Sequence, residues 1–276
     1  MSNGQGRTRC AVIGHPVEHS LSPVIHREAY AALGLDWTYD RVDVEPGGVR
    51  AFVAGLDATW RGLSVTMPHK EEIARLGEPD DVVRQTEVAN TWVRTGEGAI
   101  VRNTDVSGYR IALAAHGIDR VGHAVVVGNG ATARSALVAM ARLGARTVTV
   151  LARDPARAAG LVSVGTAMGV DVPVSVLGHP VPSAELVCST VPTAGVEPVA
   201  EMLAAAAPVV FDSVYDPWPT PLATAGAAAG RLVMNGLDLL AGQAVDQVRW
   251  MTGELVTFEL LRGAAQRAID ARATGR

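Results

Sequence analysis

The stretch HAVVVGNGATARSALVAMARLGARTVTVLAR, residues 123–153, decides how the middle of the chain folds. It opens with an apolar run, Ala124–Val127, and passes through a glycine-rich turn into an alanine-rich helical pattern, Ala131–Leu143. A second apolar run, Thr147–Leu151, follows. Short β-branched runs predict strands, and strands alternating with helices predict a parallel sheet covered by helices on both faces. The stretch therefore predicts a strand–turn–helix–strand unit of an α/β fold.

The glycine-rich turn has the spacing G-x-G-x-x-A and is formed by Gly128, Asn129, Gly130, Ala131, Thr132 and Ala133. In this spacing the first glycine permits a tight turn, and the second lets the backbone approach a pyrophosphate. The small last residue allows the helix to pack against the strand, and the helix N-terminus supplies amide donors. Between this strand and this helix, the turn predicts a dinucleotide site. The alternative is a Rossmann-like turn that binds nothing.

The end of the second strand predicts which dinucleotide binds. NAD enzymes usually have an acid there, whereas NADP enzymes often have arginine for the 2′-phosphate. Arg153 lies at the strand end and Arg157 one helical turn later, so two guanidinium groups can hold one phosphate. Asp154 either caps the helix that starts at Pro155 or repels the phosphate. Because two arginines stand at this strand end, the sequence favours NADP over NAD as the cofactor.

The same alternation extends outward from this unit. Later strands are predicted at Val172–Val176, Leu186–Ser189, Val209–Asp212 and Leu232–Met234, and helices at Pro155–Met168, Pro198–Ala206 and Leu222–Ala229. Earlier strands are predicted at Cys10–Ile13, Thr38–Val44, Leu63–Thr66 and Ala89–Arg94. A helix is predicted over Ser22–Leu33, with Ser22 as its cap, and two helices over Leu237–Ile269, broken near Thr252–Gly253.

Composition excludes several classes of protein. The chain has 276 residues, enough for two domains, and its net charge of −4 argues against a broad nucleic-acid or membrane surface. No apolar run approaches the roughly 18 residues of a membrane span, and the start of the chain is polar, without the apolar core of a signal peptide. Cys10 and Cys188 each adjoin an apolar run and are expected to be buried and unpaired. We therefore expect a cytoplasmic enzyme or binding protein.

One lysine, Lys70, stands among 24 basic residues, and the remaining 23 are arginines. In a chain biased toward arginine, a single lysine is either a neutral remnant or marks a site where a guanidinium cannot serve. Lysine is compact and can lose its proton near neutral pH when its surroundings shift it. Lys70 is therefore a candidate for chemistry.

Four polar clusters in the first 110 residues fall at the ends of predicted strands. They are Gly14–Pro23, Ser64–Lys70, Val88–Thr91 and Asn103–Asp105. Ligands of open α/β sheets bind at strand ends. Two hydroxyls in the first cluster, those of Ser20 and Ser22, precede a helix N-terminus, which suits a carboxylate.

These clusters resemble the shikimate dehydrogenase family, whose pattern runs GxPxxHSxSPxxH, NVTxPxK, AVNT and NTDxxG. The resemblance continues through the glycine-rich turn to Ser189–Pro192, Tyr215–Pro217 with Thr220–Leu222, and Asn235–Leu237 with Gln243. Eight motifs in one order are specific where each alone is weak. The resemblance implies NADPH-dependent reduction of 3-dehydroshikimate to shikimate and the reverse reaction, in the shikimate pathway of aromatic amino-acid biosynthesis.

The resemblance also implies the roles of individual residues. Lys70 and Asp105 would form the catalytic pair at the hydroxyl that is oxidised, where a group must accept a proton as hydride leaves the carbon. The substrate would be bound by Ser20, Ser22, Thr66, Asn90, Tyr215 and Gln243. Beside the glycine-rich turn and the two arginines, the cofactor would contact Thr190, Val191 and Gly236. Either Lys70 itself transfers the proton or it mainly stabilises a developing alkoxide.

Plainer interpretations exist for some of these residues. Lys70 begins a helical run and can be a surface charge, Asp105 can cap a helix near Ser107–Ala115, and His69 is expected to be an exposed neighbour. Three histidines raise the question of a metal: His15, His19 and His26. No carboxylate or cysteine completes a known ligand set with them, and hydride transfer to NADP needs no metal, so we expect none.

We predict an α/β protein of two domains with a cleft between them. Residues 1–105 plus 236–276 would bind the substrate, and residues 106–235 would form a Rossmann-like NADP domain, with closure excluding water. The expected partner is the small-molecule substrate, without nucleic acid or membrane, and a homodimer is compatible with the sequence. The alternatives are a relative acting on quinate or an aminated shikimate analogue, and a catalytically silent NADP-binding regulator. Intact Lys70 and Asp105 argue against the last.

Overall fold

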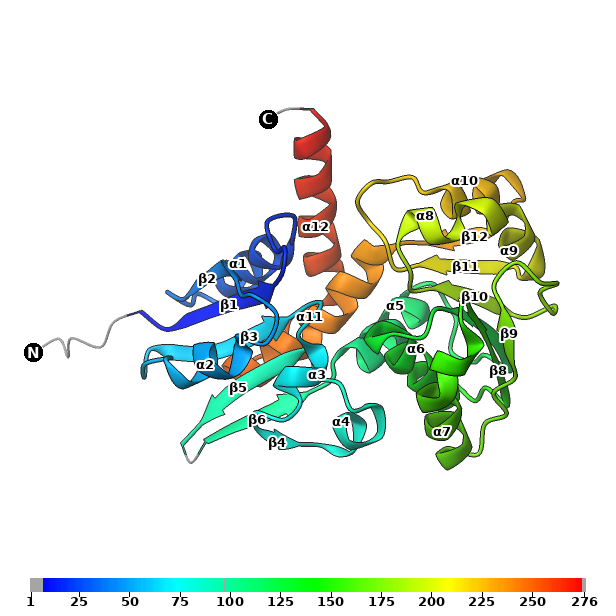
Figure 1. Cartoon of the computed structure of the whole chain (residues 1–276). Coiled ribbons are helices and arrows are strands. Elements are labelled where there is room, and N and C mark those ends of the chain that lie inside the picture. The colour runs from blue at the N-terminus through cyan, green and yellow to red at the C-terminus, as the bar shows by residue number, and fades with distance from the viewer. Residues whose placement is uncertain (1–6, 97, 275–276) are drawn as a thin grey trace, which may run out of the picture. The chain divides into compact units, whose positions relative to one another are not determined.

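The computed structural model describes residues 7–96 and 98–274, which form two compact units (Figure 1). Unit 1 contains the chain up to Gly108 and from Leu240 onward, and unit 2 contains Tyr109–Leu239. The junctions fall within helices α5, Asp105–Ala115, and α11, Gly236–Thr252, a few residues after the two junctions expected from the sequence. Each unit has its own sheet and its own apolar core.

The sheet of unit 1 has the order β2-β1-β3-β5-β6-β4. Its strands are β1 Arg9–Gly14, β2 Thr38–Asp43, β3 Trp60–Val65, β4 Glu78–Pro79, β5 Thr91–Thr95 and β6 Gly98–Arg102. Of these described strands, β5 alone runs antiparallel to its neighbours, so the expectation of a purely parallel sheet was wrong here. The reversal sets the start of β5 at the same sheet edge as the carboxyl ends of the other strands.

Helices cover both faces of this sheet. They are α1 Ser22–Ala32, α2 Val49–Ala54, α3 Lys70–Ile73, α4 Asp81–Thr86, α11 and α12 Phe258–Ala273. Alternate strand residues point to opposite faces, so Leu63 and Val65 enter a core with Val49 of α2 and Ile73 of α3. On the other face α11 packs so closely that a Cβ on Gly62 would lie 2.7 Å from Met251 Cγ. Figure 1 shows α12 beside α1 on unit 1.

Unit 2 contains a fully parallel sheet of order β12-β11-β10-β7-β8-β9. Its strands are β7 His123–Val127, β8 Thr147–Ala152, β9 Val174–Val176, β10 Leu186–Ser189, β11 Val209–Asp212 and β12 Leu232–Met234. The chain passes outward from β7 in one direction and then restarts at β10 in the other, which is the Rossmann order. The predicted α/β fold is confirmed, and the switch point lies between β7 and β10.

The helices of unit 2 connect these strands. They are α6 Ala131–Arg142, η1 Pro155–Ala158, α7 Ala159–Ala167, α8 Thr193–Val196, η2 Glu197–Val199, α9 Ala200–Ala206 and α10 Pro221–Ala228. The predicted helix over 155–168 is thus divided into a 3₁₀ turn and an α-helix. The 3₁₀ turn opens with Pro155, which follows Asp154 as the cap residue.

Two further expectations bear on packing. Ser22 does not cap α1, because Leu21 is the cap residue and the Ser22 N–H itself donates to Ser20 Oγ over 3.3 Å. Cys10 and Cys188 are buried free thiols, as predicted, and burial raises their pKa values to about 11 and about 12. None of the helices within residues 7–96 and 98–274 combines the length and apolar character needed to span a bilayer.

Candidate active site

Three predicted site residues from separate polar clusters meet at one edge of the first sheet. Lys70 begins α3 just after β3, and Asp105 begins α5 just after β6. Asn90 leads into the reversed strand β5, where its carbonyl accepts from Val65 N over 2.8 Å and its N–H donates to Arg102 O over 3.0 Å. The sheet register therefore fixes the three positions before any side-chain contact is considered.

Lys70 and Asp105 form a salt bridge that is shielded from solvent. Lys70 Nζ donates to Asp105 Oδ2 over 2.5 Å, and the side chains are 12% and 2% exposed. The other carboxylate oxygen, Oδ1, accepts from Asn90 Nδ2 over 2.8 Å. A second Nδ2 contact reaches Gln243 Oε1 on α11 at 2.6 Å. The structure thus brings Lys70, Asp105, Asn90 and Gln243 together, as the sequence predicted.

Asn90 is held by hydrogen bonds at both ends of its side-chain amide. Its Oδ1 accepts from Thr104 N over 2.8 Å, and from Thr104 Oγ1 and Thr91 Oγ1, each over 3.0 Å. Its Nδ2 faces Asp105 and Gln243. An amide nitrogen is donor only, so this arrangement fixes which end of Asn90 faces the catalytic pair.

The three predicted hydroxyls of unit 1 lie on neighbouring segments. Ser20 and Ser22 occupy the connection from β1 to α1, and Thr66 directly follows β3. Ser22 is buried, whereas Ser20 and Thr66 are half-buried. In the part of the chain that the structure describes, no hydrogen bond joins these hydroxyls to Lys70 or Asp105. The pairing of the strands alone places these hydroxyls at the same end of the sheet as Lys70 and Asp105.

The glycine-rich turn of unit 2 follows β7 at the switch point of the sheet. Gly128 has φ +115°, and a Cβ there would lie 2.5 Å from Thr190 Oγ1 and 2.9 Å from Val191 Cγ1. Gly130 caps α6 without a side-chain hydrogen bond, and a Cβ there would meet no described atom within 4 Å. The first glycine is therefore required by packing, whereas the second faces free space that a pyrophosphate could fill.

The other predicted cofactor residues of this region belong to the turn and the start of α6 or follow β8. Asn129, Ala131 and Thr132 are half-buried, and Ala133 is buried within the start of α6. Arg153 and Arg157 are exposed, and neither guanidinium group makes a hydrogen bond or ion pair with a described residue. Asp154 Oδ1 accepts from Ala156 N over 3.1 Å, so this carboxylate serves as a helix cap.

Two further predicted residues of unit 2 lie on other segments, at the start of α11 and after β11. Gly236 starts α11, and a Cβ there would collide with the Ser213 carbonyl oxygen, so a close backbone approach already requires glycine. Tyr215, expected to bind the substrate carboxylate, is half-buried on the segment after β11.

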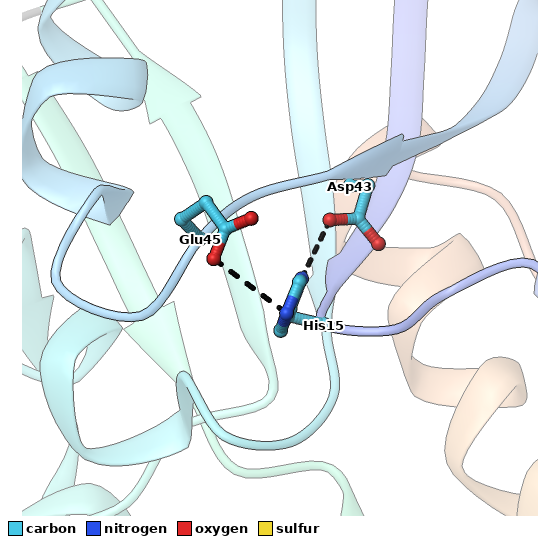
Figure 2. Close-up of side chains that lie close together, drawn as sticks. All are labelled: His15, Asp43 and Glu45. Atoms are coloured by element: carbon cyan, nitrogen blue, oxygen red, sulfur yellow. Dashed lines mark hydrogen bonds and ion pairs between the residues drawn. The ribbon is translucent and has the colours of Figure 1, made fainter.

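The histidines of unit 1 differ from their expected environments. His69 is buried rather than exposed, with Nε2 2.7 Å from Val44 O. Figure 2 shows His15 between two carboxylates: Nδ1 lies 2.7 Å from Asp43 Oδ1, and Nε2 lies 3.5 Å from Glu45 Oε2. The hydrogen bond with Asp43 raises the pKa of His15, and the negative charge of Glu45 adds to that effect. The statement that no carboxylate joins the histidines was therefore wrong, because adjacent strands β1 and β2 end together here.

Sequence reasoning placed Ser64, Thr91 and Thr104 in polar clusters without giving them a role, and it did not single out Gln247. All four are buried: Thr91 and Thr104 donate to Asn90 Oδ1, Gln247 donates to Asn90 O, and Ser64 donates to Gln247. One signal was available: Gln247 follows Gln243 by one helical turn and therefore shares its helix face. The others depend on strand register, which no single motif reveals.

Comparisons with known proteins agree with the motifs. The family model described as shikimate dehydrogenase substrate binding domain matches residues 12–92. The chain is 33% identical to the shikimate dehydrogenase (NADP(+)) of Moorella thermoacetica, covering 96% of this chain and 95% of that protein. It is similar to the crystal structure of Mycobacterium tuberculosis shikimate dehydrogenase, with 40% identity, a TM-score of 0.88, and 94% and 99% of the two chains covered. The Thermus thermophilus shikimate 5-dehydrogenase in complex with NADP(H) and shikimate has 28% identity, a TM-score of 0.81, and coverage of 95% and 99%.

Proposed function

The chain belongs to the shikimate dehydrogenase family, and on that premise we propose that it interconverts 3-dehydroshikimate and shikimate with NADP. The observation that carries the proposal is the shielded Lys70–Asp105 salt bridge, to which Asn90 donates a hydrogen bond while also contacting Gln243. The pair can handle a proton, and the amides suit the oxygens of a hydroxylated, carboxylated ring.

Lys70 and Asp105 handle the proton of the reaction. Oxidation of the alcohol to a ketone removes hydride from the carbon and a proton from the oxygen. A substrate hydroxyl at Lys70 Nζ can give that proton to the Lys70–Asp105 pair, and in the reducing direction the pair returns it to the forming alkoxide. Arginine at position 70 would stay charged and could not accept the proton.

Unit 2 provides a binding place that fits NADP. The free space at Gly130, beside the uncapped N-terminus of α6, suits the pyrophosphate, while Arg153 and Arg157 are unpaired among the described residues and would hold the 2′-phosphate. When bound, the nicotinamide accepts or supplies the hydride. The carboxylate of the substrate is assigned to Ser20, Ser22 and Tyr215. Its hydroxyls or the same carboxylate are assigned to Thr66, Asn90 and Gln243.

Near-ultraviolet absorbance of NADPH tests the proposal directly. The purified protein is offered shikimate or quinate with NADP or NAD, and the expected result is turnover with shikimate and NADP above all other pairs. No turnover with any pair would contradict the enzyme assignment and favour a silent NADP-binding regulator. Faster turnover with quinate would assign the alternative substrate.

The two arginines after β8 supply the test of cofactor choice. The variant Arg153→Ala with Arg157→Ala should raise KM for NADP at least about tenfold, because a charge-assisted phosphate contact is lost, and leave KM for NAD nearly unchanged. Arg120→Ala removes an exposed arginine elsewhere in unit 2 and is the matched control. Equal losses with NADP and NAD would contradict the role of Arg153 and Arg157.

Location and assembly also belong to the proposal. We infer a cytoplasmic enzyme from the two free, buried cysteines, since a reducing compartment keeps thiols unpaired. The sequence is compatible with a homodimer, and analytical ultracentrifugation of the purified protein measures the assembly state.

A further inference from the structure

A buried chain of hydrogen bonds runs from Tyr39 to the amide of Gln243. Tyr39 Oη donates to Ser64 Oγ over 2.5 Å, and Ser64 Oγ donates to Gln247 Oε1 over 2.9 Å. Gln247 Nε2 then lies 3.5 Å from Gln243 Oε1. Tyr39, Ser64 and Gln247 are 0%, 3% and 1% exposed, so the chain lies away from solvent.

The number of available donor hydrogens fixes the direction of each hydrogen bond in this network. A hydroxyl has one hydrogen, so Ser64, which accepts from Tyr39, turns its own hydrogen to Gln247 Oε1. Gln247 Nε2 must then face the opposite side, where it donates to the backbone oxygen of Asn90 over 3.2 Å. A flipped Gln247 would set its oxygen against the oxygens of Asn90 and Gln243, leaving buried acceptors without donors.

The same count of donors and acceptors fixes the orientation of the Gln243 side-chain amide. Its Oε1 faces Asn90 Nδ2 at 2.6 Å and Gln247 Nε2 at 3.5 Å, so the oxygen is turned inward between two donors. Within residues 7–96 and 98–274, Gln243 Nε2 has no hydrogen-bond partner, and the residue is half-buried rather than buried. Both hydrogens of that nitrogen are therefore left for a ligand.

We propose that Tyr39 is a positioning residue that, through Ser64 and Gln247, holds Gln243 with its oxygen inward and its two N–H groups toward the substrate. The inference rests on the proposed function, which assigns Gln243 to the substrate. The substrate atoms that match these two N–H groups are hydrogen-bond acceptors, such as a hydroxyl oxygen or a carboxylate of the ring. An aminated analogue that places an ammonium group against Gln243 meets donors only and is rejected.

We call the hydrogen-bonded series Tyr39–Ser64–Gln247–Gln243 the relay, and exchange of Tyr39 for phenylalanine tests it. In Tyr39→Phe, KM for shikimate should rise about tenfold, as the loss of roughly one oriented hydrogen bond implies. The kcat should stay within about twofold, because Gln243 binds ground state and transition state alike. Tyr30→Phe is the matched control, since Tyr30 is equally buried but its hydroxyl contacts Met251 Sδ at 3.9 Å. An unchanged KM in Tyr39→Phe, or an equal rise in Tyr30→Phe, would overturn the proposal.

A double substitution separates a relay from two independent packing effects. Ser64→Ala breaks the same chain one bond later and should raise KM by a similar factor. The combined variant Tyr39→Phe, Ser64→Ala should be no worse than the worse single variant, because residues of one network do not add. Multiplied effects would show that Tyr39 and Ser64 act separately and would contradict the relay.

A readout without turnover distinguishes failure of the relay from failure of the proposed function. If the wild-type protein does not oxidise shikimate, the proposed function fails, but amide orientation is still measurable by NMR in ligand-free protein. The side-chain ¹⁵N–¹H signals of Gln243 and Gln247 should shift in Tyr39→Phe and stay in place in Tyr30→Phe. Unmoved signals in Tyr39→Phe would refute the relay whatever the activity.

Discussion

At the scale of single residues, the proposed mechanism depends on a lysine side chain that arginine should not replace. Lys70 Nζ meets Asp105 in a space that leaves the lysine 12% exposed. We predict that Lys70→Arg keeps the unfolding temperature within a few degrees and lowers kcat at least about 100-fold, the usual contribution of a positioned proton-transfer group. Steady-state oxidation of shikimate measures the loss. Arg75→Lys, an exposed exchange near the end of α3, is the control, and a near-normal kcat in Lys70→Arg would remove Lys70 from the mechanism.

A second residue gives the fold a defined response to acid. His26 is fully buried, stacks on Tyr39 with ring centroids 4.1 Å apart, and donates through Nδ1 to Ser22 O. Its Nε2 has no partner among the described residues. Burial lowers the pKa of His26 to about 4, and the backbone contact with Ser22 only partly opposes this. Because the unfolded chain then binds a proton more readily than the folded one, the stability due to neutral His26 is lost as pH falls from about 6.5 toward 4.

Chemical unfolding at two pH values tests this response. His26 should contribute about 2 kcal/mol less to the free energy of unfolding at pH 5 than at pH 7. In His26→Asn, whose amide can replace the Nδ1 donor, the difference between the two pH values should shrink by that amount. His15→Asn is the contrasting variant, because a raised pKa gives His15 a contribution that is present at low pH and lost as pH rises. An unaltered pH dependence in His26→Asn would contradict the assignment.

Motifs and side-chain chemistry could predict the reacting residues but not their supports. The roles of Lys70, Asp105, Asn90 and Gln243 were expected from the family resemblance; the first three stand in motifs at the ends of strands, and Gln243 lies within α11. The Ser64–Gln247 contact joins residues 183 positions apart, so it exists only through the packing of α11 on β3. No local pattern encodes that contact.

At the scale of elements, buried parallel strands were the easiest to predict. The observed bounds of β10, β11 and β12 equal the predicted ones, since each is an apolar run enclosed by polar or small residues. The strands β4 and β6 were missed because β4 is a two-residue strand at the sheet edge and β6, which lies between β5 and β4, is a short run of mixed sequence. Without β6, the reversed direction of β5 could not be inferred.

The glycine-rich turn before α6 gives a paired prediction. Gly128→Ala should lower the stability of unit 2 by at least about 1 kcal/mol, because φ +115° and the contact with Thr190 both oppose a Cβ. Gly130→Ala meets open space and should keep the unfolding temperature while weakening NADP binding about tenfold or more. Thermal unfolding and NADP titration measure both. Normal NADP affinity in Gly130→Ala would place the pyrophosphate elsewhere.

At the scale of the whole molecule, the two units should respond to different ligands. Trp37, Trp60, Trp92 and Trp250 belong to unit 1 and Trp218 to unit 2, so Trp218→Phe makes fluorescence report on unit 1 alone. Shikimate at a hundred times its Kd should raise the free energy of unfolding of unit 1, as followed by tryptophan fluorescence, by about 2.7 kcal/mol. NADP alone should shift the circular-dichroism transition more than the fluorescence transition. A fluorescence shift with NADP but none with shikimate would reverse the proposed assignment of ligands to units.

The division of unit 1 by unit 2 has a consequence for protein synthesis. The ribosome makes Lys70, Asn90 and Asp105 early, but Gln243 and Gln247 emerge only after all of Tyr109–Leu239 has been translated. The residues that orient Asn90 precede unit 2, whereas the contact of Asn90 with Gln243 joins it to a segment made last. The order of translation therefore delays completion of the proposed substrate site until unit 2 has left the ribosome.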